Sequence, residues 1–124
     1  MILGIGIDVV HIDRMQRWQN IPGLLERFFH PRELEASRSR GHSAVLSLAA
    51  RFAAKEAFGK ALGTGLKNLS LKEIEVTNNH NGKPDISVSG QAKEAVVNMG
   101  GKSIHLSLTH ESDNAIAIVI IEGE

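Results

Sequence analysis

Residues 51–65, RFAAKEAFGKALGTG, predict the second half of a long helix that spans about Ser43–Leu62. Gly63 and Gly65 predict its end, because glycine readily adopts the left-handed conformation found at helix C-termini. One face of the helix carries small apolar side chains at helical spacing, namely Leu46, Ala49, Ala50, Ala53, Ala57 and Ala61. Because alanine is small, we expect another element to approach this face closely.

Two charged residues of this helix, Glu56 and Lys60, lie one turn apart on the flank of the alanine face. Arg51 and Lys55 point to nearly the opposite side of the helix. A carboxylate and an ammonium group in this arrangement form either an ordinary helix ion pair, worth about 0.2–0.5 kcal/mol, or part of a functional site. The helix alone favours neither interpretation.

The length and composition indicate one domain, residues 1–124, with an aliphatic core, because the chain has four Phe, one Trp and no Tyr. No apolar run reaches membrane-spanning length, and no basic and apolar leader opens the chain, so we expect no membrane partner. The absence of cysteine excludes disulfides, thiolate metal sites and a thiol nucleophile. These features favour a cytoplasmic protein.

The charges are distributed unevenly along the chain although the net charge is zero. Residues 1–55 carry eight basic and five acidic side chains, whereas residues 56–124 carry six and nine. The basic N-terminal part can attract an anionic partner, although such charge is more often an ordinary solvated surface. The overall balance argues against nucleic acid as the partner.

The N-terminal part predicts a short strand over Met1–Asp8, with glycines at alternate positions where another backbone or a ligand comes close. Asp8 is predicted to end this strand. Spacing alone favours Asp8 as a helix cap or turn former over a metal ligand or general base. A helix over His11–Asn20 follows, then helical turns beginning near Pro22 and Pro31, and a polar loop over Ser37–His42.

The C-terminal part predicts two hairpins separated by a short helix. Asn78–Gly82 is a strong turn signal, because Asn-Gly suits turns that need positive φ. The predicted elements are strands over 71–77 and 85–89, a helix over 90–99, and strands over 104–110 and 115–121. This order predicts an α+β fold with a mainly antiparallel sheet packed on the long helix.

Three groups of residues can carry chemistry: Asp8, the pair Glu56 and Lys60, and the polar strand face with His105, Ser107 and Thr109, together with His110. The chain has no Gly-x-Ser-x-Gly elbow for a serine nucleophile and no histidine spacing typical of zinc. Two carboxylates and a lysine suit Mg²⁺ better, since Mg²⁺ is commonly held by one or two carboxylates together with substrate phosphates.

The chain resembles holo-[acyl carrier protein] synthase, the short bacterial type of phosphopantetheinyl transferase. Gly4–Arg14, GIGIDVVHIDR, is similar to the N-terminal G-x-G-x-D block of that family, which ends in arginine. Arg51–Gly65 is similar to its central F-A-x-K-E-A-x-x-K-A-x-G-x-G block, and His105–Glu111, HLSLTHE, to its C-terminal H-x-S-x-(S/T)-H block. The order and spacing of the blocks extend the resemblance over the whole chain. One departure is His11, where the family commonly has Glu.

The resemblance implies transfer of 4′-phosphopantetheine from coenzyme A to a serine of apo-acyl carrier protein, with adenosine 3′,5′-bisphosphate as the other product. It implies that Asp8 and Glu56 hold Mg²⁺ and that Lys60 neutralises charge on the phosphates. Either Glu56 or a water activated by the metal takes the serine proton, and the sequence leaves both open. The residues implied for coenzyme A binding are Arg51, Lys60, Gly63, Thr64, Gly65, His105, Ser107 and Thr109.

The resemblance also implies an acidic acyl carrier protein as partner, a role in fatty acid biosynthesis, and a homotrimer whose active sites lie between subunits. Arg14 and Arg17 on the first helix are the residues we expect to dock the carrier. A small trimer that binds a nucleotide or an acidic protein without turnover is the main alternative. Nucleic-acid binding is a third hypothesis, which the net neutrality of the chain disfavours.

Overall fold

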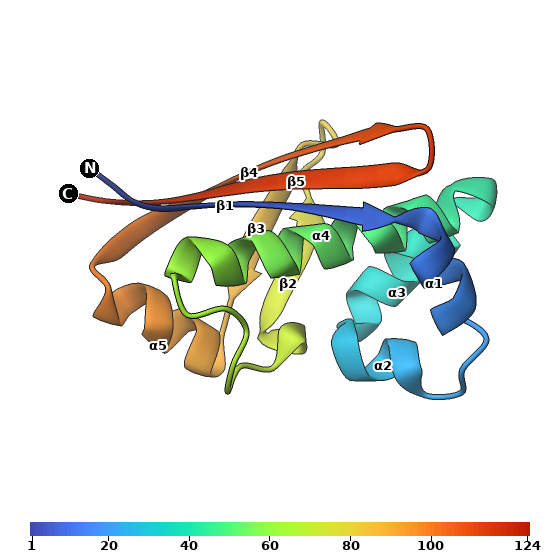
Figure 1. The fold of residues 1–124 in the computed structure, drawn as a ribbon, viewed down its shortest axis with the longest axis horizontal. Coiled ribbons are helices and arrows are strands. Elements are labelled where there is room, and N and C mark those ends of the chain that lie inside the picture. The colour runs from blue at the N-terminus through green and yellow to red at the C-terminus, as the bar shows by residue number, and fades with distance from the viewer.

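The long helix α4 (Ala44–Leu62) lies along one face of a three-stranded antiparallel sheet in the computed structural model, which describes all residues 1–124 (Figure 1). The strand order is β1 (Ile2–His11), β5 (Asn114–Gly123) and β4 (Gly101–Glu111). A separate hairpin of β2 (Ile74–Asn78) and β3 (Pro84–Val88) is also antiparallel. The predicted α+β class and both predicted hairpins are therefore confirmed, although the strands form two sheets.

Three short helices gather at one end of α4, and a fourth lies near the other end, where both termini meet (Figure 1). The helices are α1 (Ile12–Trp18), α2 (Leu24–Phe28), α3 (Pro31–Arg38) and α5 (Gly90–Asn98). Two 3₁₀ turns cover Gly41–Ser43 and Leu71–Glu73. No helix combines the length and the hydropathy that a membrane span requires.

The contact between β1 and α4 depends on two glycines of β1. A Cβ atom on Gly4 would overlap the carbonyl group of Ala61, and one on Gly6 would overlap the carbonyl of Ala57 and lie 2.7 Å from the backbone nitrogen of Ala61. The strand and the helix are therefore in backbone contact. The alanine face of α4 and the absence of a side chain at Gly4 and Gly6 together permit this approach.

Helix α4 is buried on nearly all sides, including the side that carries Arg51 and Lys55. The Lys55 ammonium group is fully buried and donates to Glu33 Oε1 at 2.7 Å and to the carbonyl of Leu71 at 2.8 Å. Glu33 in turn accepts from the backbone nitrogen of Val76 at 3.0 Å. This buried pair ties α4 to α3 and β2, and its remaining lone pairs and protons are satisfied, as a buried ion pair requires.

Several predicted boundaries are wrong. Strand β1 continues to His11, so Asp8 neither ends the strand nor caps a helix. The cap of α1 is His11, whose Nδ1 accepts from the backbone nitrogen of Asp13 at 3.2 Å. The predicted Ser37–His42 loop is also wrong at its start, because α3 extends to Arg38 and the side chain of Ser37 is buried.

The close approach of β1 to α4 predicts a large penalty for a methyl group at Gly6. We expect Gly6→Ala to lower the free energy of unfolding by about 3 kcal/mol, because the strand and the helix must separate. Urea denaturation measures this change. The control is Gly23→Ala, where φ is 79° and no atom lies within 4 Å of the added methyl group. Strain alone predicts a loss of about 1 kcal/mol there, and equal losses in the two variants would contradict the packing argument.

Candidate active site

Asp8 of β1 and Lys60 of α4 form an ion pair where the strand crosses the helix. The Lys60 ammonium group donates to Asp8 Oδ1 at 3.0 Å and to the backbone carbonyl of Ile7 at 3.0 Å. The Asp8 side chain is only 16% exposed, whereas that of Lys60 is 54% exposed. The interpretation of Glu56 and Lys60 as an ordinary helix pair is therefore wrong, because Lys60 forms its ion pair with Asp8.

Glu56 lies near the Asp8–Lys60 ion pair, and the charge of Asp8 acts on its carboxyl group. Partial burial raises the pKa of Glu56, and the negative charge of Asp8 raises it further, whereas Arg14 and Lys60 oppose the shift. Two carboxylates close enough for their charges to interact are suited to a cation. No third Asp, Glu, His or Cys joins them, which leaves coordination positions for water and substrate oxygens, as Mg²⁺ prefers.

The predicted glycine-rich segment directly follows the turn that carries Lys60. Gly63 ends α4 in the left-handed conformation with φ 86°, and Gly65 has φ 71°. Open space surrounds the Cα atoms of both glycines, and Thr64 between them is exposed. The predicted helix end is confirmed, and an anionic group can approach this backbone without meeting a side chain.

Asp8 and Glu56 form what we call the acid pair. The polar residues of β4 do not lie beside this acid pair within one chain. Asp8 pairs with Ala117 of β5, which pairs with Leu108 of β4, so these three residues share the sheet face that covers α4. Ser107 and Thr109 flank Leu108 in the sequence and therefore project from the opposite face.

His105 occupies that opposite face with Ser107 and Thr109, since all three alternate along β4. Its Nε2 lies 2.9 Å from Glu122 Oε1. This hydrogen bond lowers the pKa of Glu122. The predicted coenzyme-binding residues thus lie on two different sides of the sheet in a single chain.

Arg51 lies in a third place, a cleft of about 270 Å³ between α4, β4 and the β2–β3 hairpin. Its guanidinium group donates to the hydroxyl of Ser37, the carbonyl of Val76 and the side chain of Asn78 at 3.2–3.3 Å, and no carboxylate contacts it. Burial lowers its pKa. A buried cation whose hydrogen-bond partners are all neutral favours an anionic ligand.

Sequence reasoning missed most of the residues around Arg51. His110 of β4 lines the same cleft and was visible as the last residue of the C-terminal motif. Arg40 and Asn78 also line it. Neither has a sequence signal for ligand binding, because the 3₁₀ turn after Arg40 and the hairpin that contains Asn78 bring them to the cleft from distant positions.

The predicted docking residues Arg14 and Arg17 are both exposed on α1. The guanidinium carbon of Arg14 lies 5.1 Å from the ring centroid of Trp18 and 5.2 Å from that of Phe52. Because its charge lowers the pKa of Glu56, Arg14 stands beside the acid pair. The basic helix and the candidate metal site are therefore neighbours.

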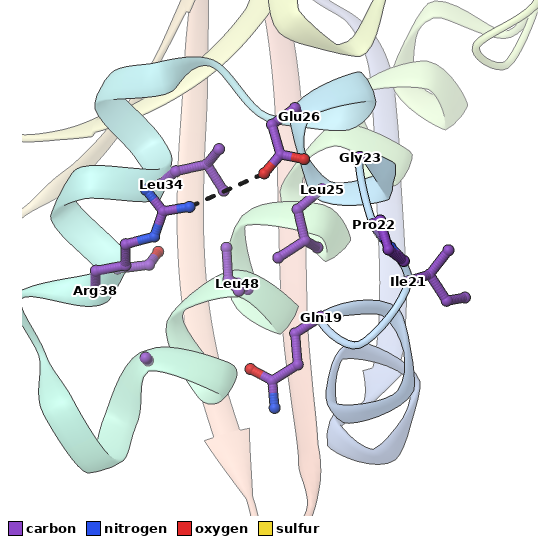
Figure 2. A pocket seen from close by; sticks show the side chains of 11 residues that line it. Gln19, Ile21, Pro22, Gly23, Leu25, Glu26, Leu34, Arg38 and Leu48 are labelled. Atoms are coloured by element: carbon purple, nitrogen blue, oxygen red, sulfur yellow. Dashed lines mark ion pairs between the residues drawn. The ribbon is translucent and has the colours of Figure 1, made fainter.

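A separate cavity of about 300 Å³ lies beneath the connection between α1 and α2 (Figure 2). Leu25, Leu34 and Leu48 form its apolar wall, and Arg38 and Glu26 form an ion pair of 4.0 Å at its side. None of the predicted catalytic, metal-binding, coenzyme-binding or carrier-binding residues lines it. This cavity is therefore separate from the candidate active site.

Comparison with known proteins shows the family of this chain. The sequence profile of the 4′-phosphopantetheinyl transferase superfamily matches residues 4–119. The holo-[acyl-carrier-protein] synthase of Treponema denticola is 56% identical over 123 residues, which cover 99% of this chain and 100% of the relative. That of Treponema pallidum is 52% identical over 124 residues, 100% of this chain and 98% of the relative.

Solved structures show the same fold. The crystal structure of holo-[acyl-carrier-protein] synthase from Neisseria meningitidis has a TM-score of 0.89 and 34% identity, and the match covers 98% of this chain and 99% of that one. The enzyme from Bacillus anthracis in complex with CoA (3′,5′-ADP) has a TM-score of 0.83 and 34% identity, with coverage of 100% and 99%. The predicted family and fold are confirmed.

The charge interaction between Asp8 and Glu56 predicts a change in the pKa of Glu56 that can be measured without metal. We expect Asp8→Asn to lower the pKa of Glu56, because it removes the neighbouring negative charge. A ¹³C NMR titration of the glutamate carboxyl groups in metal-free protein measures this pKa. Asp13→Asn, which neutralises an exposed acid on α1, is the matched control and should leave it unchanged. If Asp8→Asn also leaves it unchanged, the two carboxylates do not share a site.

Proposed function

The chain belongs to the 4′-phosphopantetheinyl transferase superfamily, and we propose that it converts apo-acyl carrier protein into holo-acyl carrier protein. It transfers 4′-phosphopantetheine from coenzyme A to a serine hydroxyl of the carrier and releases adenosine 3′,5′-bisphosphate. The observation that carries this proposal is the meeting of Asp8, Glu56 and Lys60 in a chain that matches holo-[acyl-carrier-protein] synthases over its full length. We further assign it to fatty acid biosynthesis in the cytoplasm, where coenzyme A and the carrier meet.

Asp8 and Glu56 are the residues that would hold Mg²⁺. Their fit rests on the chemistry of the two donor groups: they are carboxylates close enough for the charge of Asp8 to act on Glu56, and carboxylate oxygens are ligands that Mg²⁺ prefers. When bound, Mg²⁺ would supply positive charge to the pyrophosphate of coenzyme A. The same carboxylates would bind a cation poorly without substrate oxygens, because they provide only two side chains.

The reaction is a displacement at phosphorus, so most catalysis comes from positioning and electrostatics. The serine oxygen forms a bond to the β-phosphorus of coenzyme A while the bond to the leaving adenosine 3′,5′-bisphosphate breaks. Lys60 neutralises charge on the phosphate oxygens, and the open backbone at Gly63–Gly65 accommodates them. Glu56 accepts the serine proton directly or through water.

The distribution of the coenzyme-binding residues supports a homotrimer with shared sites. Ser107 and Thr109 project away from the acid pair of their own chain. In a trimer they would face the acid pair of a neighbouring subunit. The same sheet face is apolar along its edge strand, where Ile5, Ile7 and Val9 are each more than half exposed. Contiguous apolar surface of this kind marks an interaction site, and a cyclic trimer covers it in every subunit.

Arg51 and His110 are the residues we propose to receive another anionic group of coenzyme A. Their cleft contains none of the acid-pair residues, so it would serve the site of a neighbouring subunit. On the other side of the acids, Arg14 and Arg17 would dock the acidic carrier, because helix α1 adjoins Glu56. The carrier serine would then reach the phosphate from the docking side.

The proposed role of the acids predicts a loss of transfer in their neutral variants. We expect Asp8→Asn and Glu56→Gln each to lower kcat/KM by about 100-fold or more, a typical result of removing a group that stabilises transition-state charge. Mass spectrometry of the carrier measures the added phosphopantetheine over a series of Mg²⁺ concentrations, and a chelator should abolish it. The control is Glu94→Gln on α5, which should retain activity. Full activity with the chelator would contradict the magnesium proposal.

The shared site predicts complementation between two variants that each lack one residue of the proposed site. Asp8→Asn and His110→Ala subunits, unfolded together and refolded as mixed trimers, should regain activity, because a site formed between them can contain both native residues. Random mixing gives about one quarter native sites when the two residues come from different subunits. A mixture no more active than the separate variants would show that Asp8 and His110 act within one chain.

A further inference from the structure

We propose that Trp18 is a positioning residue for carrier docking: its indole ring, together with Phe52, holds the Arg14 guanidinium group where an acidic side chain of the carrier binds. The inference rests on the proposed function and names a residue that determines its second substrate. Trp18 is the only tryptophan of the chain.

Arg14 lies against two aromatic rings that approach it from different elements. Arg14 and Trp18 are four residues apart on α1, and this spacing places them on one face of the helix. Phe52 belongs to α4. The guanidinium carbon lies 5.1 Å from the Trp18 centroid and 5.2 Å from the Phe52 centroid, within the range of a cation–π interaction. The two rings meet edge to face at 5.0 Å and 79°.

The two aromatic rings position the Arg14 guanidinium group, but no carboxylate pairs with it. Its guanidinium group forms no ion pair and no side-chain hydrogen bond in the chain, although Glu56 lies close enough for their charges to interact. Stacking on aromatic rings restricts the side chain while leaving its donors free, and arginine suits this because its planar group keeps its fork of N–H donors. Arg17, by contrast, lies over no aromatic ring. Preorganisation therefore favours Arg14 over Arg17 as the anchor for a carboxylate of the partner.

The rings also connect the docking helix to the acid pair. Trp18 packs on Phe28 at 5.2 Å and on Phe52. Phe52 is buried and lies one helical turn before Glu56 on α4. A carrier that binds Arg14 is therefore positioned relative to α4, the helix that also carries the catalytic carboxylate of Glu56. This geometry makes Trp18 a determinant of how the carrier binds, not of how coenzyme A binds.

The test compares variants that remove the indole ring but keep an apolar side chain. We expect Trp18→Leu or Trp18→Met to raise the KM for apo-carrier by about three- to ten-fold, the size of effect that one cation–π contact supports. The kcat and the KM for coenzyme A should stay within about two-fold, since uniform binding affects KM alone. Trp18→Phe keeps a ring and should restore most of the carrier affinity. Transfer by the wild-type protein is measured first, so absence of transfer there would contradict the proposed function and not this inference.

Two controls separate positioning from packing. Phe28→Leu removes a ring that packs on Trp18 but does not contact Arg14, and it should leave the KM for apo-carrier unchanged. In the Arg14→Ala background, Trp18→Leu should have no further effect on that KM, because the two residues act as a unit. The proposal is overturned if Trp18→Leu raises the KM equally with and without Arg14, if Phe28→Leu raises it as much, or if the ring-deleting variants bind the carrier normally.

Discussion

The site depends on the backbone contact between β1 and α4. Gly4 and Gly6 leave room for the carbonyl groups of α4, and Asp8 follows on the same side of the strand, where it reaches Lys60. A larger side chain at either glycine would move Asp8 away from the helix that carries Glu56 and Lys60. The glycines of β1 and the alanines of α4 therefore act together to place Asp8 against Lys60 and near Glu56.

Contacts of α4 with other elements hold the helix in place. The buried Lys55–Glu33 pair fixes α4 to α3 and β2, and the aromatic rings of Trp18 and Phe52 fix it to α1. Lys55 directly precedes Glu56 in the sequence. Because Lys55 is fixed by its buried ion pair, α4 has little freedom to rotate and move the Glu56 carboxylate out of the site. The partly buried position of Glu56 and its raised pKa are consequences of this fixed placement.

The sequence predicted the α4 helix, its glycine end and both hairpins, because these follow from local periodicity and turn chemistry. It placed Asp8 wrongly at a strand end, since only pairing with β5 extends β1 to His11. The burial of Lys55 could not be predicted, because its partners come from distant positions along the chain. Motif resemblance identified Ser107 and Thr109, but only the strand register shows that they face away from the acids of their own chain.

The central claim is that Asp8 and Glu56 bind one divalent cation together. The most direct test is anomalous diffraction from crystals of the protein grown with Mn²⁺, as a substitute for Mg²⁺, and coenzyme A. The account predicts a single anomalous peak at coordination distance, about 2.0–2.2 Å, from oxygen atoms of both carboxylates and from phosphate oxygens of the coenzyme. A cation bound to phosphates alone, or to only one of the two acids, would contradict it.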